Sequence, residues 1–313
     1  MTTVTSARAL ATMPADEVDR WFATEHPERI VALVAALSDK DLDRLVALPH
    51  LREPAVRHVL GRLPEFALPG PLAKVSGLVE FAIEVPRADP ERHALRFGDG
   101  TVSRVPVGEQ PADVIVGLAA ADFVRLVTGT RNAALLLLAD RLRVRGDEML
   151  ALRVGGLFQV PGRPGVAVDP AEVDPEAAAL VLRRAKDAHL RRLMEGGFRD
   201  VVLQQIFERL PEFLDGEQAV GHSLDVGFTV TGRPDGTADR RAVRVHDGTC
   251  TVEEASGGES GRDAVVTAHG ADFLKLVTGN LNPVLGVVRG ALKVRGDVTA
   301  ALTLHRIMRV PGS

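Results

Sequence analysis

The sequence predicts an α+β protein made of two tandem copies of one unit, each with a roughly five-stranded, largely antiparallel sheet covered by helices. Two observations support this prediction. The C-terminal part of each copy repeats at a constant offset. Each copy also changes from helical spacing of its apolar residues to strict alternation and back again. We therefore expect one arrangement of helices and strands to occur twice within the 313 residues.

The repeat is clearest near the end of each copy. Residues 121–162 recur as residues 271–312 at an offset of 150, and 19 of these 42 positions are identical. Upstream, Arg62–Phe66 returns as Arg209–Phe213 with a small change of offset. Agreement of this extent is not produced by chance, so the duplication covers helices and strands alike.

The duplication predicts the domain organisation. We place the first unit at 14–162 and the second at 175–313. The Pro- and Gly-rich residues 163–174 between them are expected to form a linker. We expect residues 175–313 to fold alone, because they contain a full copy of the repeat.

Strands are predicted where apolar and polar residues alternate, which is typical of a strand with one buried face. Val79–Val85 and Leu224–Val230 show this period of two. Asp-Gly pairs at 99–100 and 247–248 suit tight hairpins, which need positive φ angles. Further strands are expected at 114–116, 264–266, 142–145 and 292–295.

Helices are predicted before and after these strands in the sequence. Val201–Leu210 has apolar residues at helical spacing. Asn132 and Asn282 are placed to cap helices, and Gly129 and Gly279 suit left-handed helix ends. Short helices are expected at 123–127 and 273–277, and closing helices whose apolar stripes reach Leu157 and Phe158 in one copy and Ile307 and Met308 in the other.

Composition excludes several classes of protein. A formal net charge of −4 argues against a nucleic-acid partner, which would need a basic surface. Cys250 is the single cysteine, so no intramolecular disulfide can form, and we expect a cytoplasmic protein. The N-terminus lacks a secretory signal, and the apolar run Ala133–Ala139 is too short to cross a bilayer. We expect at most transient membrane contact.

No catalytic or metal-binding constellation is apparent. The nine histidines are scattered, so we predict no catalytic residue, metal or cofactor. His246, Asp247 and Cys250 are close in sequence, but a hairpin explains Asp247, and we expect Cys250 to pack as a small apolar strand residue. Residues 256–261 lack the spacing of a hydrolase elbow and are predicted to form a loop.

Basic residues alternate with apolar ones on the last strand of each copy. Arg143, Arg145, Lys293 and Arg295 are therefore expected to form a solvated face. The tripeptide Arg-Gly-Asp occurs at the end of both strands. We predict that its glycine makes a turn and its aspartate caps the closing helix.

The stretch that begins at Asp272-Phe273 resembles the sterol carrier protein type 2 domain family. Gly279, Asn282-Pro283 and the run Leu292–Asp297 follow in the order of that family, and Phe207–Pro211 is similar to its approach to the first strand. The resemblance implies a layer of sheet and helices around an apolar tunnel for sterols, fatty acids or acyl derivatives. The second unit matches this pattern better than the divergent first unit.

The candidate site residues come from the apolar faces of the predicted helices. Arg125 and Lys275 lie beside these faces and are candidates to meet a ligand head group. The candidate pocket residues are Phe273, Leu276, Val277, Leu285, Val288, Leu304, Ile307 and Met308 in the second unit, and Phe123, Leu126, Val127, Leu157 and Phe158 in the first.

The leading hypothesis is a non-catalytic binding or carrier protein with an internal pocket for a fatty acid, acyl derivative, sterol or other lipid-like metabolite. One alternative is an interaction scaffold whose pockets have closed and which binds a protein partner. Another is a cofactor-free isomerase or cyclase that orients its substrate in the apolar cavity. The sequence leaves these alternatives open.

Overall fold

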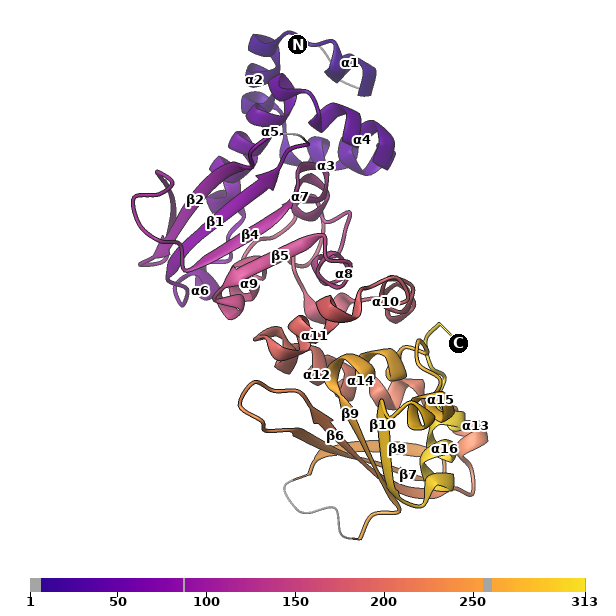
Figure 1. Ribbon diagram of the computed structural model, residues 1–313. Coiled ribbons are helices and arrows are strands. Elements are labelled where there is room, and N and C mark those ends of the chain that lie inside the picture. Colours follow the sequence, from indigo (N-terminus) through magenta and orange to yellow (C-terminus); the bar gives the residue numbers. More distant parts are fainter. Residues whose placement is uncertain (1–6, 87, 256–260, 313) are drawn as a thin grey trace. The chain divides into compact units, whose positions relative to one another are not determined.

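The computed structural model describes residues 7–86, 88–255 and 261–312 (Figure 1). The chain divides into two compact units, Met1–Glu172 and Val173–Ser313. The expected linker, 163–174, spans this division. Except for Gly261, the loop predicted at 256–261 lies outside the described residues.

Each unit contains one five-stranded sheet, as the sequence predicts, and each sheet is mixed. In the first sheet the order is β3-β2-β1-β4-β5, and in the second it is β10-β9-β6-β7-β8. The β1–β4 and β6–β9 pairs are parallel, and all other neighbours are antiparallel. The strands are β1 (Gly77–Glu84), β2 (Glu91–Gly98), β3 (Thr101–Val105), β4 (Val114–Ala119), β5 (Leu142–Gly146), β6 (Ser223–Thr231), β7 (Asp239–His246), β8 (Thr249–Glu254), β9 (Ala264–His269) and β10 (Leu292–Gly296).

Helices precede, separate and follow the strands in both units. In the first unit they are α1 (Ala7–Ala11), α2 (Ala15–Thr24), α3 (Pro27–Ala36), α4 (Asp39–Val46), α5 (Pro49–Arg62), α6 (Pro69–Leu72), α7 (Ala120–Val127), α8 (Ala133–Leu138) and α9 (Glu148–Gly155). In the second they are α10 (Pro175–Leu182), α11 (Asp187–Glu195), α12 (Phe198–Arg209), α13 (Gly216–Ala219), α14 (Gly270–Val277), α15 (Pro283–Val288) and α16 (Val298–Ile307). Short 3₁₀ turns occupy Leu63–Phe66, Pro170–Glu172 and Leu210–Phe213.

Local signals in the sequence correctly located the turns and caps. The hairpin residues Asp99 and Asp247 have φ angles of 51° and 43°, and the glycine after each also has a positive φ. The Asn132 side chain accepts a hydrogen bond from the Ala134 amide at 2.8 Å, and Asn282 caps α15 in the same way. Each side chain satisfies a helix-terminal N–H that has no partner within the helix.

The Arg-Gly-Asp tripeptides have the predicted structural role. Gly146 has a φ of 102°, and a Cβ there would overlap the carbonyl oxygen of Asp113. Asp147 then accepts a hydrogen bond from the Leu150 amide at 2.8 Å and so caps α9. In the second unit Gly296 and Asp297 repeat the arrangement.

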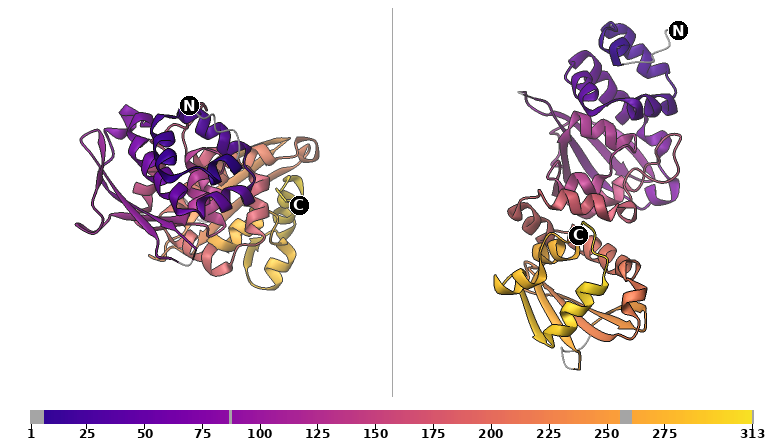
Figure 2. Two further views of the ribbon diagram at one scale, coloured as in Figure 1. Left: turned by 90° about the horizontal axis from the view of Figure 1, so that it is seen from above. Right: turned by 90° about the vertical axis from the view of Figure 1, so that its right-hand side faces the viewer.

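One face of each sheet is the core face. Val79 and Ile83 are fully buried on β1, while Glu84, at the opposite phase of the strand, pairs with Arg143 at 2.8 Å. Helices α7 and α9 pack on the first sheet, and α14 and α16 pack on the second. Figure 2 shows the yellow C-terminal helix lying across the strands of its own sheet. The four basic residues of the last strands are exposed, as predicted.

The closing helices are shorter than the apolar stripes suggest. Helix α9 ends at Gly155, because two consecutive glycines disfavour its continuation. Phe158 instead forms an antiparallel bridge with Ala67, and Met308 forms the equivalent bridge with Leu214. The prediction that Leu157, Phe158 and Met308 continue a helix was therefore wrong.

The bridges bring the two ends of each sheet-containing segment together. The Leu68 amide donates to the Leu157 carbonyl at 2.9 Å, and the Gln159 amide donates to the Phe66 carbonyl at 2.9 Å. In the second unit the Asp215 amide donates to the Ile307 carbonyl at 2.8 Å. The chain after each closing helix therefore lies beside the chain that leads into the first strand.

A buried arginine–carboxylate pair also occurs in both units. Arg52 of α5 pairs with Glu91 at 2.7 Å, and Arg199 of α12 pairs with Asp239 at 2.7 Å. Both carboxylates stand at the first position of the second strand of their sheet. The pair therefore joins the long helix that precedes the strands in each unit, α5 or α12, to the sheet of that unit.

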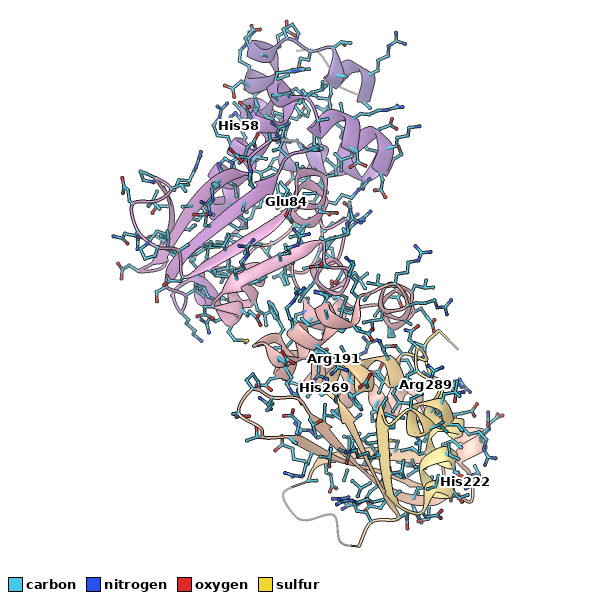
Figure 3. All side chains as sticks on the ribbon, in the orientation of Figure 1. His58, Glu84, Arg191, His222, His269 and Arg289 are labelled. Atoms are coloured by element: carbon cyan, nitrogen blue, oxygen red, sulfur yellow. The ribbon has the colours of Figure 1, made fainter. Side chains whose placement is uncertain are left out.

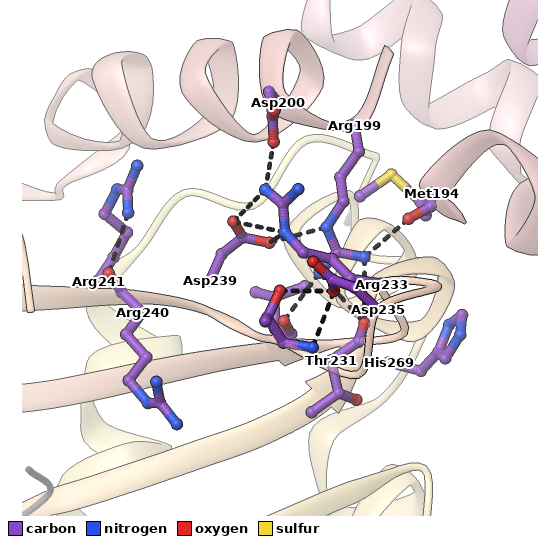
Figure 4. A network of polar contacts seen from close by, with 12 residues as sticks. Met194, Arg199, Asp200, Thr231, Arg233, Asp235, Asp239, Arg240, Arg241 and His269 are labelled. Atoms are coloured by element: carbon purple, nitrogen blue, oxygen red, sulfur yellow. Dashed lines mark hydrogen bonds and ion pairs between the residues drawn. The ribbon is translucent and has the colours of Figure 1, made fainter. Parts of the chain in front are cut away.

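Arg199 is the more completely enclosed arginine, with a side chain that is 2% exposed. It donates to the carbonyls of Met194 at 2.7 Å and Val230 at 2.8 Å, in addition to Asp239 (Figure 4). Arg233 also donates to Asp239. Burial opposes ionisation of Asp239, but the hydrogen bonds from Arg233 and Arg199 outweigh it and lower the pKa of this carboxyl.

We expect Arg199→Met to lower the free energy of unfolding of the second unit by about 3 kcal/mol, because buried carbonyls and a carboxylate lose their donor. Denaturant unfolding of the full chain measures this loss. The exposed Arg192→Met is the matched control and should change stability by less than about 0.5 kcal/mol. Equal effects of the two substitutions would contradict the structural role of Arg199.

His269 caps α14, and we expect this cap to make the second unit sensitive to acid. Its Nδ1 accepts a hydrogen bond from the Ala271 amide at 3.2 Å, which requires an unprotonated Nδ1. Burial and the nearby Arg191 cation lower the pKa of the imidazole (Figure 3). The cap therefore contributes stability above the ordinary pKa of 6.5, and this contribution is lost as the pH falls through the lowered pKa.

His269→Asn retains a capping side chain without a titrating ring. We expect the variant to lose less stability than the wild type between neutral and mildly acidic pH, measured by thermal unfolding of the full chain. The exposed His246→Asn serves as the control and should leave the acid sensitivity unchanged. An unchanged profile for His269→Asn would rule out the cap as its source.

We propose that each unit folds on its own, since each has its own sheet and its own buried apolar clusters. Residues 173–313 produced alone should give a cooperative thermal transition and the circular dichroism of a mixed α+β domain. A broad transition would instead show that the second unit depends on the first.

Candidate functional site

The candidate site is the core face of the second sheet, where it meets α14 and α16. The strand register places Val226 of β6 opposite Val243 of β7 on one side and Ala264 of β9 on the other. All three are buried. Because side chains alternate along a strand, Phe228 and Val230 of β6 face the same side as Val226.

Three phenylalanines form an aromatic group over this face. Phe207 comes from α12, Phe228 from β6 and Phe273 from α14. The ring centroids of Phe207 and Phe273 are 5.3 Å apart, and those of Phe228 and Phe273 are 5.8 Å apart. These separations are typical of favourable aromatic pairs, so the group joins helices and sheet at one place.

The apolar packing of the second unit is divided into two clusters of described residues. One contains Phe207 and Phe273, and the other contains Leu304 and Ile307. The side chains that pack against both clusters are only partly buried, and they are Leu210, Phe228 and Val252. In the first unit the corresponding described residues form one continuous cluster on the sheet.

The second sheet also carries smaller side chains at matching core positions. The two sheets have the same register, so positions on their strands correspond one to one. Ile83, Leu95, Val114 and Leu118 of the first unit correspond to Val230, Val243, Ala264 and Ala268 of the second, and all eight are buried. Larger residues occur on α12, where Leu203 and Phe207 correspond to Val56 and Leu60 of α5. The side-chain volume lost in the second unit is therefore located against the sheet.

A cation lies at the margin of this apolar face. Arg241 stands opposite Phe228 in the register, and its guanidinium carbon is 5.8 Å from the centroid of the Phe207 ring. It pairs with Glu254 at 2.9 Å, but the Glu254 side chain is 78% exposed, so water screens the pair strongly. Sequence reasoning missed Arg241, although a basic residue in the inward phase of an alternating strand was the available signal.

The first unit has a histidine at the matching position. His93 stands opposite Phe81, and its Nε2 is buried without a hydrogen-bond partner among the described residues. Burial and the Arg104 cation lower the pKa of this imidazole. A neutral ring thus replaces the guanidinium of the second unit.

The structure brings most of the predicted pocket residues to the two cores. Phe273, Leu276, Leu304, Ile307, Phe123, Leu157 and Phe158 are buried, while Val277, Met308, Leu126 and Val127 are partly buried. Leu285 and Val288 are exposed at the surface. The reason is Gly286, the buried residue of α15, which packs closely against Leu281 and Leu292 and turns the other side of the helix outward.

Both predicted head-group residues have carboxylate partners on a neighbouring helix. Arg125 pairs with Asp39 at 2.8 Å and donates to the Leu37 carbonyl at 3.0 Å. Lys275 pairs with Asp187, and this hydrogen bond lowers the pKa of the Asp187 carboxyl. The two ion pairs join α7 to α4 and α14 to α11, so an equivalent connection between helices occurs in both units.

Cys250 lies on β8 in an apolar environment. Burial raises the pKa of the Cys250 thiol to about 11, and its side chain packs against an apolar cluster, as expected for a strand residue. The described residues contain no group of three or more histidine, cysteine or acidic side chains that could hold a metal ion. Within the same residues, none of the helices has the length and apolar character needed to cross a membrane.

The chain is similar to proteins of one family in both of its units. It matches the SCP-2 sterol transfer family over residues 57–159 and 224–309. Sterol carrier protein 2 of Homo sapiens is 30% identical over 141 residues, which make up 44% of this chain and 25% of the human protein. The chain thus spans about a quarter of the length of this curated relative.

Among solved structures, the sec-alkylsulfatase Pisa1 from Pseudomonas sp. is 20% identical, with a TM-score of 0.31 over 36% of this chain and 17% of that chain. The sterol carrier protein domain 2 of Helicoverpa armigera is also 20% identical, with a TM-score of 0.24 over 38% of this chain and 82% of that chain.

Proposed function

Because the chain belongs to the SCP-2 sterol transfer family, we propose that its second unit is a non-catalytic carrier of an apolar ligand. The ligand would lie between the two apolar clusters, against the core face of β6, β7 and β9. Its class is a fatty acid, an acyl derivative, a sterol or another lipid-like metabolite. The description of the family as one of sterol transfer supports this assignment.

One observation carries the proposal: the second unit keeps the register of the first but has smaller residues against its sheet. Ala268 stands where the first unit has Leu118, and Ala264 stands where it has Val114. Meanwhile Phe228 and Val252 remain partly exposed between the clusters. A ligand that covers such surface gains roughly 0.8 kcal/mol for each buried methylene.

Arg241 is the residue we assign to the polar end of the ligand. It borders Phe228, and the partner that it would release, Glu254, is largely solvated. A ligand carboxylate could therefore replace Glu254 at little cost. Arg125 and Lys275 stay candidates, but a ligand would have to displace Asp39 or Asp187 from them.

The first unit supports a second role. Its core cluster is continuous, and larger residues fill the positions on the sheet. We infer that this copy has a closed interior and acts as an interaction module for a protein partner. The two copies would then divide ligand binding and partner binding between them.

The test replaces a small core residue of the second unit with the larger residue at the matching position of the first. We expect Ala268→Leu to leave the free energy of unfolding within about 0.5 kcal/mol of the wild type, because the proposed ligand site would accommodate the added atoms, and to weaken ligand binding at least about tenfold. Binding is measured with the fluorescent probes cis-parinaric acid and dehydroergosterol, and mass spectrometry after organic extraction identifies any co-purified lipid.

The reciprocal variant Leu118→Ala is the control. It should cost about 2–5 kcal/mol, as in a filled core, and should leave probe binding unchanged. A loss of about 1–3 kcal/mol for Ala268→Leu, as in an overpacked core, would refute the proposed space. Absence of saturable binding to both probes would refute the carrier function itself.

Arg241→Met separates the head-group role from the apolar contacts. Loss of one charge-assisted hydrogen bond should weaken the binding of cis-parinaric acid by about tenfold. The affinity for dehydroergosterol, which has no carboxylate, should stay within about twofold of the wild type. An equal loss for both probes would show that Arg241 shapes the site without binding a carboxylate.

A further inference from the structure

Helix α15 exposes an unusual amount of apolar surface. Four of its six residues are large aliphatic side chains at the surface: Val284 is 54% exposed, Leu285 48%, Val287 41% and Val288 78%. Isolated exposed aliphatic residues are ordinary, but several on two turns of one helix form a patch, and such patches mark interaction sites.

The orientation of the helix is fixed by its inner side. Gly286 is buried, and a Cβ there would be 2.8 Å from the Cδ1 atom of Leu292. The Asn282 side chain caps the helix through the Leu285 amide at 3.0 Å. The close approach at Gly286 therefore holds the aliphatic residues outward, and they cannot turn inward without losing this packing.

Two basic residues that follow the patch in the chain have no ion-pair partner among the described residues. Arg289 follows α15 directly, and Lys293 lies on β10, the edge strand beside it (Figure 3 marks Arg289). Both are exposed, and neither forms an ion pair with another described residue. In sequence, no acidic residue lies between Asp272 and Asp297. The charged residues between these two positions in the sequence are therefore all basic.

The first unit neutralises the matching surface. Arg143, the counterpart of Lys293, pairs with Glu84 at 2.8 Å and with Asp140 at 3.6 Å. In the second unit Thr231 and Gly290 stand at the positions of these two acids. None of the α8 side chains reaches the exposure of those on α15. The apolar and basic surface is therefore a property of the second copy.

We propose that α15 and the neighbouring cations Arg289 and Lys293 form a docking surface for an anionic lipid bilayer. The aliphatic side chains would enter the boundary between head groups and acyl chains, and the two cations would contact lipid phosphates. A protein partner is the poorer fit, because most of the binding energy of a protein interface comes from a few hot-spot residues. These are enriched in tryptophan, tyrosine and arginine, whereas valine and leucine are under-represented among them.

The experiment is sedimentation of the full chain with vesicles of phosphatidylcholine, with and without phosphatidylglycerol. We expect binding to the anionic vesicles and little to the neutral ones, weakened by added salt. The double substitution Leu285→Ser with Val288→Ser should weaken binding by at least about tenfold, since it removes buried methylenes. Lys293→Glu should weaken it by at least about fivefold.

Matched controls are available in the first unit. Val107→Ser changes another exposed valine, and Lys40→Glu makes the same change of charge. Both should stay within about twofold of the wild type. The Ala268→Leu variant should still bind vesicles, because docking does not require the ligand site. Loss of vesicle binding in that variant alone would overturn the proposal and assign the effect to lipid uptake.

Other outcomes also overturn it. Failure of the wild type to bind anionic vesicles would do so, as would equal binding by the α15 variants. If the wild type instead forms dimers that the double substitution abolishes, measured by sedimentation velocity, the patch is an interface between copies of the chain. Because these residues are exposed, the variants should retain wild-type thermal stability, which confirms that each result reports on the surface.

Discussion

The architecture of the second unit depends on the burial of one guanidinium group. Arginine keeps its charge under all ordinary conditions, so a buried arginine must be surrounded by acceptors. Arg199 meets this requirement with Asp239 and with carbonyls at the ends of α11 and β6. These contacts fix where α12 begins relative to the sheet. Phe207, about 12 Å further along that helix, is thereby held over Phe228 and Phe273.

The two units share one backbone arrangement but differ in their core and surface side chains. Hydrogen-bond register, hairpins and caps are shared, and they depend on backbone geometry and a few polar side chains. Core volume and surface charge differ, because neither is needed to define the strand order. In the first unit the buried Leu118 stands where the second unit has the smaller Ala268, and Asp140 supplies a charge that Gly290 lacks. Duplication thus preserved the scaffold and allowed the interior and the surface to diverge separately.

Local features were predictable from the sequence and long-range ones were not. Asp-Gly hairpins and Asn caps depend on contacts within a few residues, so short sequence patterns identify them. Each of these features occurs in both copies of the repeat. The Arg199–Asp239 pair joins residues that are 40 positions apart, and no local pattern signals it. Likewise, Leu285 and Val288 were assigned to a pocket because they are apolar, whereas the packing of Gly286 decides that they face outward.

The β-bridges after the closing helices bring together the two ends of the sheet-containing segment in each unit. The chain enters the first sheet near Ala67 and leaves it at Phe158, and these residues are paired directly; Leu214 and Met308 repeat this in the second unit. A segment whose two ends meet can be copied in tandem, or inserted into another protein, without altering the order of its strands. It can equally be circularly permuted, with the old ends joined and new ones opened at the Asp99-Gly100 hairpin. The architecture is thus suited to modular reuse.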